Sequence, residues 1–67
     1  MKISLMDTTK TLLQEISNIE MNKKDVTITY KLALQSSETT NWKIVNMAII
    51  NRWGKKGLKE IKKRIYA

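Results

Sequence analysis

The sequence predicts an all-α protein, a small bundle of about four short helices in one domain that spans residues 1–67. Three observations favour this fold. Apolar residues recur at helical spacing in separate stretches, no proline interrupts them, and the only two glycines stand close together within a basic C-terminal segment. A chain this short buries roughly 60% of the surface of its unfolded form, so its core must be small.

The first expected helix covers residues 8–20. Its apolar residues fall at helical spacing and are Leu12, Leu13, Ile16 and Ile19. Asp7 precedes them and can cap the free N–H groups of the first turn. The opening residues 2–6 fit either a short strand or a disordered start, of which disorder is the more common at a chain terminus.

Residues 25–35 fit two structures. Apolar and polar residues alternate from Val26 to Gln35, which is the pattern of a half-buried strand and would make the fold α+β. The same stretch also carries a helical stripe, formed by Val26, Tyr30, Ala33 and Leu34, with Asp25 as an N-cap. We favour the helix, because a strand here could pair only with the short segment 2–6 and two strands make a poor sheet.

The third and fourth expected helices meet at Gly54. Residues 41–53 are apolar around most of the helix circumference, which is typical of the most buried helix of a bundle. Gly54 then suits a helix end that needs a left-handed residue. The fourth helix, residues 55–66, has a narrow apolar stripe, and its Glu60 can pair with Arg64.

The polar residues 36–40 predict a turn between the second and third helices. This layout is helix-turn-helix-like, although the turn is longer than the 3–4 residues usual in that motif and lacks its common glycine.

Positive charge is concentrated at the C-terminus. Residues 52–67 hold seven of the thirteen basic side chains and one acid, for a formal charge of +6, whereas residues 1–51 sum to +1. Charge segregated in this way predicts an anionic partner rather than a structural role.

Composition argues against several classes of function. The chain has no His and no Cys, so the commonest general base, thiol nucleophiles and soft-metal sites are missing, and no glycine-rich phosphate loop occurs. We therefore expect no enzymatic activity, no cofactor and no metal. No apolar run is long enough for a bilayer span or a signal peptide, so we expect an intracellular protein of the cytoplasm, nucleoid or nucleus that is not secreted.

The expected function is nucleic-acid binding, DNA or RNA, by a small accessory or regulatory protein. The residues expected to grip the phosphate backbone are Lys55, Lys56, Lys59, Lys62, Lys63 and Arg64, with Arg52 beside them. The chain has eleven Lys and two Arg, which suits phosphate contact better than base reading. Any sequence specificity should come from polar residues near the start of the preceding helix: Thr39, Thr40, Asn41, Lys43 and Asn46. Asn46 is the leading candidate among them, because Asn can bond adenine bidentately.

The alternative is a helical protein–protein interaction module that docks an acidic partner through the same helix. Its apolar anchors would be Trp53, Leu58, Ile61 and Ile65. A homo-oligomer is a further expectation, because a small core leaves apolar surface to cover. Binding to a membrane surface is the least favoured partner, since three aliphatic residues give the basic helix only a thin apolar face.

Overall fold

The computed structural model describes residues 7–36 and 39–66. All regular secondary structure in these residues is α-helical: the chain forms three helices, α1 (Asp7–Ser17), α2 (Lys23–Gln35) and α3 (Trp42–Tyr66), and no strand. The all-α prediction is confirmed, and the α+β alternative with a strand at residues 25–35 is wrong. The expectations for residues 2–6 and for the side chain of Asp7 lie outside what the structure describes.

The expected count of about four helices becomes three because the last two are joined. α3 is assigned as one helix of 25 residues, but Gly54 has φ 82° and ψ 173°, which lies outside the helical region. We therefore treat α3 as an N-terminal segment, residues 42–53, and a C-terminal segment, residues 55–66, that meet at a sharp bend. Gly54 has the positive φ that was expected of it.

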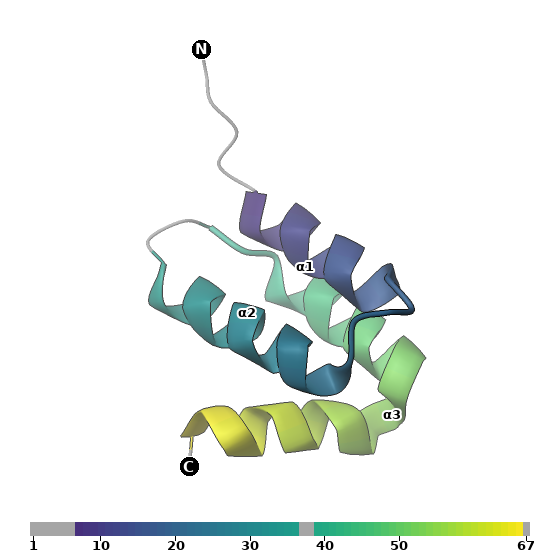
Figure 1. The fold of residues 1–67 in the computed structure, drawn as a ribbon. Helices are drawn as coiled ribbons and strands as arrows, with labels where there is room; N and C mark the ends of the chain where they lie inside the picture. Colours follow the sequence, from purple (N-terminus) through teal and green to yellow (C-terminus); the bar gives the residue numbers. More distant parts are fainter. Residues whose placement is uncertain (1–6, 37–38, 67) are drawn as a thin grey trace.

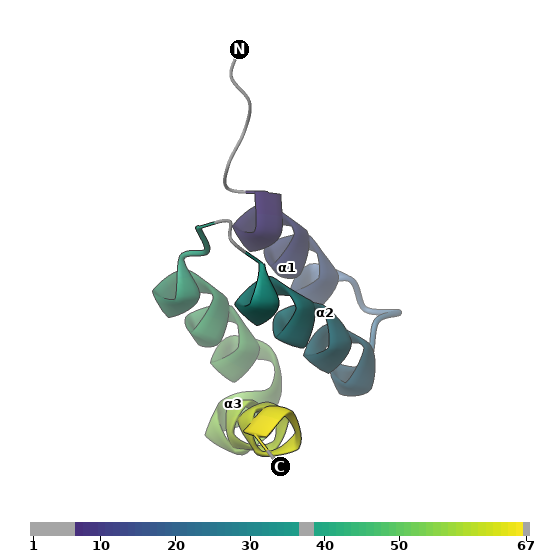
Figure 2. The same cartoon turned by 90° about the vertical axis from the view of Figure 1, so that its left-hand side faces the viewer.

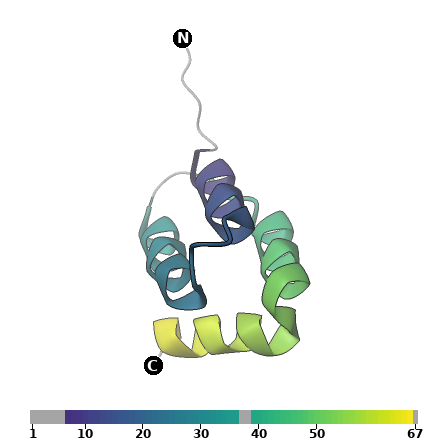
Figure 3. The ribbon, with the colours of Figure 1, turned by 45° about the vertical axis from the view of Figure 1, so that its right-hand side comes forward.

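The three helices and the bend arrange the chain in two tiers. α1, α2 and the N-terminal segment of α3 lie side by side, and the C-terminal segment of α3 crosses beneath α2 (Figures 1 and 3). Figure 2, turned by 90°, shows this last segment nearly end-on below the other helices. The face of the C-terminal segment that points away from α2 therefore has no helix packed on it.

The core lies where these elements meet. Its buried apolar side chains are Leu12, Ile16, Val26, Tyr30, Ala33, Val45, Ile49 and Ile61. Helical spacing identified most of these positions. Of the expected α2 stripe, Val26, Tyr30 and Ala33 are buried, whereas Leu34 is 38% exposed. Ile19 is an exception: it is 88% exposed because α1 ends at Ser17 instead of continuing to residue 20.

The beginning of α2 is fixed by a capping box. Asn22, and not Asp25, is the N-cap: its side chain accepts a hydrogen bond from the Asp25 backbone N–H at 2.8 Å. The Asp25 carboxylate accepts in return from the Asn22 N–H at 3.5 Å. Two otherwise unpaired donors are thus satisfied, and the N-cap of α2 lies three residues earlier than the sequence suggested.

The start of α3 is tied to α1. The Thr8 hydroxyl donates to the Thr39 carbonyl at 3.3 Å and lies 2.5 Å from the Thr40 hydroxyl. The Asn41 backbone N–H donates to the Thr9 hydroxyl at 2.8 Å. These bonds hold α1 and the N-terminal segment of α3 together as neighbours.

Candidate nucleic-acid interface

The C-terminal segment of α3 divides cleanly into a packed side and a basic side. Gly57 and Ile61 are buried, and Leu58 and Ile65 are partly buried against the core. With about 100° between successive helical residues, five lysines fall within an arc of about 120° on the opposite side. We call them the basic stripe: Lys55, Lys56, Lys59, Lys62 and Lys63. All five are exposed, and they extend about 12 Å along the helix.

Two glycines give the basic stripe its orientation. Gly54 makes the bend, with a backbone conformation that residues with side chains rarely adopt. Gly57 lies so close to Trp53 that a Cβ at this position would come within 2.3 Å of the Trp53 Cβ. The absence of a side chain at both positions lets the C-terminal segment fold back under α2 with its lysines pointing outward.

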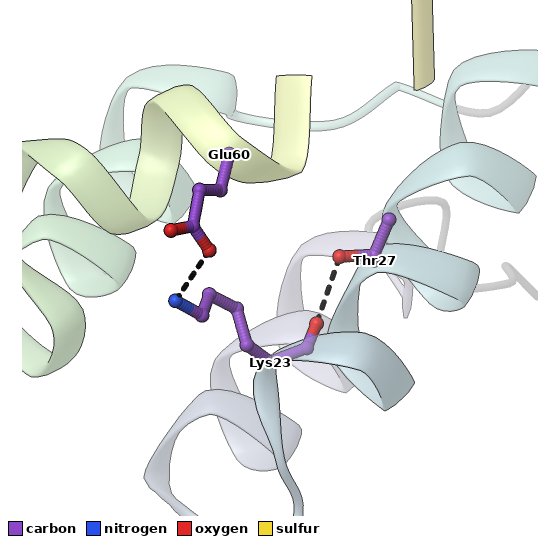
Figure 4. A network of polar contacts seen from close by, with 3 residues as sticks. All are labelled: Lys23, Thr27 and Glu60. Carbon is purple, nitrogen blue, oxygen red and sulfur yellow. Dashed lines mark hydrogen bonds and ion pairs between the residues drawn. The ribbon is translucent and has the colours of Figure 1, made fainter. Parts of the chain in front are cut away.

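An ion pair holds this segment to α2. Lys23 Nζ lies 2.7 Å from Glu60 Oε1, and the Thr27 hydroxyl donates to the Lys23 carbonyl at 2.8 Å (Figure 4). The hydrogen bond and the charge of Lys23 lower the pKa of Glu60, and the charge of Arg64 adds to this effect. The ion pair predicted from the sequence was with Arg64, but the one in the structure is with Lys23.

Glu60, the one acid of the basic segment, is therefore paired with a lysine from another helix, α2. Glu60 is turned toward α2 and away from the basic stripe, so no carboxylate interrupts the five lysines. Arg64 is exposed and lies on the flank of the segment nearest α2, outside the arc of the stripe.

Arg52 has a structural role in this fold. One guanidinium nitrogen, Nη1, donates to the carbonyls of Ile16 at 2.8 Å and Asn18 at 2.9 Å. The other, Nη2, donates to those of Ile19 at 3.4 Å and Met21 at 2.7 Å. These bonds close the end of α1 and the turn that follows it, so the donors expected to reach phosphates are already used within the chain.

Arg52 also covers Trp53. Its guanidinium carbon lies 4.4 Å from the centre of a Trp53 ring, a cation–π contact. Because Gly57 approaches the same side chain, Trp53 is held between its neighbours and packs against the core. Such a side chain offers a partner less free surface than an anchoring residue needs.

The other expected anchors are also occupied. Ile61 is fully buried in the core, so a partner could not reach it without unfolding the domain. Leu58 and Ile65 pack against that core. The apolar stripe of the last helix thus attaches the helix to its own domain.

The residues expected to read bases lie apart from the basic stripe. Asn46 accepts a hydrogen bond from the Tyr30 hydroxyl at 2.8 Å, and a bidentate contact with adenine would require breaking it. Lys43 is exposed near the start of α3, about 15 Å along the helix axis from the bend. Exposed Met47 and Asn51 lie between, so the lysines do not form one continuous face across both segments.

Tyr30, the partner of Asn46, also contacts Trp42 at the edge of the core. The Tyr30 and Trp42 rings are 4.6 Å apart between centroids and tilted by 47°. Burial raises the pKa of Tyr30, as does the nearby Tyr66, while the hydrogen bond to Asn46 lowers it.

A cleft that the sequence did not predict lies beside the basic stripe. It has a volume of about 480 Å³ and lies between the α1–α2 turn, the start of α2 and the C-terminal segment of α3. Lys24 and Arg64 both line it, as do Glu20 and Glu60. The adjacent lysines Lys23 and Lys24 are the feature of the sequence that could have indicated this cleft. Only the fold places them around the same cleft as Arg64.

No family model, curated protein or solved structure matches this chain. Within the described ranges, no three or more acidic side chains gather where they could hold a metal ion. The helices of residues 7–36 and 39–66 include none with the length and apolar character needed to cross a bilayer.

Proposed function

We propose that this protein binds nucleic acid through the phosphate backbone, using the basic stripe of α3. The observation that supports the proposal is the placement of five exposed lysines on one side of one helix, with the single acid of that helix paired elsewhere. Such a surface displaces condensed counterions from DNA or RNA, and the affinity then depends strongly on salt.

The proposed binding is largely independent of base sequence. The stripe has no arginine, whose planar guanidinium is the best reader of guanine, and the Asn46 carbonyl oxygen is engaged by Tyr30. The connection between α2 and α3, residues 36–41, also exceeds the turn of a helix-turn-helix motif. We therefore propose an accessory or regulatory binder, working in the cytoplasm, nucleoid or nucleus, and not a sequence-reading repressor.

An acidic protein is the alternative partner for the same stripe. Docking a helix into a protein groove requires apolar anchors as well as charge. The expected anchors are packed inside the domain, and Tyr66, which is 71% exposed, is the large apolar side chain that remains open beside the lysines. This arrangement favours phosphate over a protein groove.

Affinity measured over a salt series tests the proposal. We expect log K to fall linearly with log[salt] for both duplex and single-stranded probes, with a slope between about −3 and −5 if four or five lysines contact phosphates. A slope near zero, or no binding at low salt, would contradict phosphate contact.

Two triple variants separate the stripe from overall charge. Lys59→Glu, Lys62→Glu and Lys63→Glu together reverse the centre of the stripe. The matched control reverses three exposed lysines on other faces, Lys10→Glu, Lys31→Glu and Lys43→Glu, and so has the same net charge. We expect the first variant to abolish binding and the second to retain most of it, both with unchanged circular dichroism. Equal losses in the two would show that net charge alone drives binding.

A further inference from the structure

The cleft between the α1–α2 turn, the start of α2 and the C-terminal segment of α3 carries a net positive charge. Four cationic side chains and two acidic ones line it, for a formal charge of +2: Lys23, Lys24, Arg52, Arg64, Glu20 and Glu60. Charge of one sign that is concentrated in a cleft attracts groups of the opposite sign, so this cleft favours an anionic ligand. We call it the basic cleft.

Two of the four cations are free to contact a ligand. Lys23 is paired with Glu60 at 2.7 Å (Figure 4), and the Arg52 guanidinium donates to four backbone carbonyls. Lys24 and Arg64 are exposed, and neither side chain has a hydrogen bond or an ion pair in the described part of the chain. Arg64 influences the pKa of Glu60 through its charge alone. Lys24 and Arg64 are therefore the cations that an anion in the basic cleft would meet.

The volume of the basic cleft fits more than a bare anion. At about 480 Å³, it lies within the range of about 300–1,000 Å³ that is usual for small-molecule sites. A phosphate ion would fill a small part of this space, whereas a nucleotide adds a sugar and a base to the phosphate. The cleft thus has both the charge and the room for one nucleotide.

The basic cleft also adjoins the basic stripe. With about 100° between successive residues of a helix, Arg64 lies on the side of the C-terminal segment that faces α2, and Lys56 and Lys63 are the stripe residues nearest to that side. Glu60 lies between them and Arg64, but its charge is compensated by Lys23. A strand whose phosphates contact the stripe can therefore continue into the cleft.

We infer that the basic cleft takes one unpaired nucleotide of a single strand, with Lys24 and Arg64 contacting its phosphate. This inference rests on the proposed binding of nucleic acid through the basic stripe, and it names the form of nucleic acid that the protein binds best. In a duplex the bases are stacked and paired, so a nucleotide can enter a cleft only after it has been flipped out, at the cost of unstacking and unpairing. The stripe is open to both forms, whereas the cleft selects the single strand.

Glu20 supplies a variant with an effect of the opposite sign. It lines the same cleft, it is exposed, and its carboxylate has no partner among the described residues. A phosphate in the cleft is repelled by this carboxylate, so Glu20→Gln should strengthen single-strand binding about twofold, and duplex binding less.

Affinities for a single strand and for a duplex of the same length test the inference, with the full chain and one salt series. Lys24→Ala together with Arg64→Ala should lower the affinity for the single strand about tenfold at low salt. The slope of log K against log[salt] should become shallower by about 1.4, because two phosphate contacts are lost. The affinity for the duplex should change by less than about threefold. The responses of the two probes are compared, and not their absolute affinities, because a duplex has the higher charge density.

Lys10→Ala together with Lys43→Ala is the matched control, because it removes the same two charges at exposed sites outside the stripe and the cleft. It should change both affinities by less than about twofold, since distant surface charges are screened by salt. All variants should keep the circular dichroism of the wild type.

The outcomes separate this inference from the proposed function. Equal losses on both probes for the Lys24 and Arg64 variant, or a single-strand loss no larger than that of the control, would overturn the inference and leave binding through the stripe intact. If the wild-type chain binds neither probe at low salt, the proposed function fails and the inference fails with it. A loss confined to the single strand, together with a gain from Glu20→Gln, supports the basic cleft as a nucleotide site.

Discussion

Replacing Arg52 by alanine should destabilise the fold strongly although the residue lies at the edge of the basic segment. Its guanidinium donates to four backbone carbonyls at the end of α1 and in the following turn. The bonds to Ile16 and Met21 are partly buried, so water cannot fully replace them after substitution, whereas the bonds to Asn18 and Ile19 are exposed. Only the first two should contribute substantially to stability.

The expected loss follows from these two bonds and one aromatic contact. A partly buried hydrogen bond to a charged group contributes about 1.5 kcal/mol at the low end of its range, and the cation–π contact with Trp53 adds about 0.5 kcal/mol. Together they give about 3.5 kcal/mol, out of the roughly 3–10 kcal/mol that a chain of this size has in total. In thermal unfolding this corresponds to a decrease in Tm of about 14–28 °C.

Urea unfolding followed by far-UV circular dichroism measures this loss. Arg52→Lys keeps the charge but lacks the planar guanidinium that reaches several carbonyls. Its free energy of unfolding should therefore fall between those of Arg52→Ala and the wild type. Lys55→Ala removes one positive charge from an exposed site and serves as the control. If the free energies of unfolding of Arg52→Ala and Lys55→Ala differ by less than about 0.5 kcal/mol, the hydrogen bonds of Arg52 do not stabilise the fold and the reasoning is refuted.

Four further substitutions probe other parts of the structure. Gly54→Ala should cost about 1–3 kcal/mol from backbone strain alone, since a Cβ there has nothing within 4 Å, whereas D-alanine introduced by chemical synthesis should be tolerated; equal losses would contradict this. Gly57→Ala should cost about 1–3 kcal/mol through a steric clash, and it should shift the NMR signal of the neighbouring indole N–H. Tyr30→Phe should cost about 1 kcal/mol at neutral pH. The raised pKa of Tyr30 means that its neutral form is favoured in the folded state, so this stabilisation should disappear as the pH rises above 10.0 and through the folded pKa, which urea titrations at several pH values would reveal. Lys23→Met should raise the pKa of Glu60 toward its ordinary value in an NMR titration; because the folded pKa is lowered, the contribution of this pair exists above the unfolded pKa and is lost as the pH falls through the folded value.

The sequence predicted the helices well where periodicity decided the outcome. The α2 stripe at Val26, Tyr30 and Ala33 is buried, and its alternation with polar residues, which also fitted a strand, reflects only that Ile28 and Leu32 are exposed on the outer side of the helix. A period of two and a period of 3.6 share several positions over such a short stretch, so the sequence alone left both open.

The helix ends and the polar contacts could not be predicted in the same way. Asp25 looks like an N-cap in the sequence, but the backbone enters the helix three residues earlier, at Asn22, where a reciprocal pair of bonds is available. In the sequence, Arg52 is the first cation of the basic segment and is therefore expected on the basic surface. Only folding brings it to the carbonyls of a turn more than thirty residues away.

At the candidate site, too, some contacts form only on folding and could not be predicted from composition. Charge composition identified the basic segment, but it could not sort seven cations into those that hold the fold and those that face a partner. The structure assigns Arg52 to the fold and, through Lys23, turns Glu60 away from the surface. What remains is a narrower set of five lysines on one side of one helix.

If the proposed nucleic-acid binding uses these five lysines, it should depend on the fold and not only on charge. Gly54 fixes the direction of the C-terminal segment, and Ile61 fixes its rotation, because burying that side chain forces the lysines to the opposite side. A free peptide with the sequence of residues 55–66 would have the same charge but no fixed side, since an isolated helix of twelve residues is marginal in water. The peptide should therefore bind more weakly than the intact chain at every salt concentration. If the two bind with equal affinity, the domain serves only to carry the charge, and the orientation described above has no part in binding.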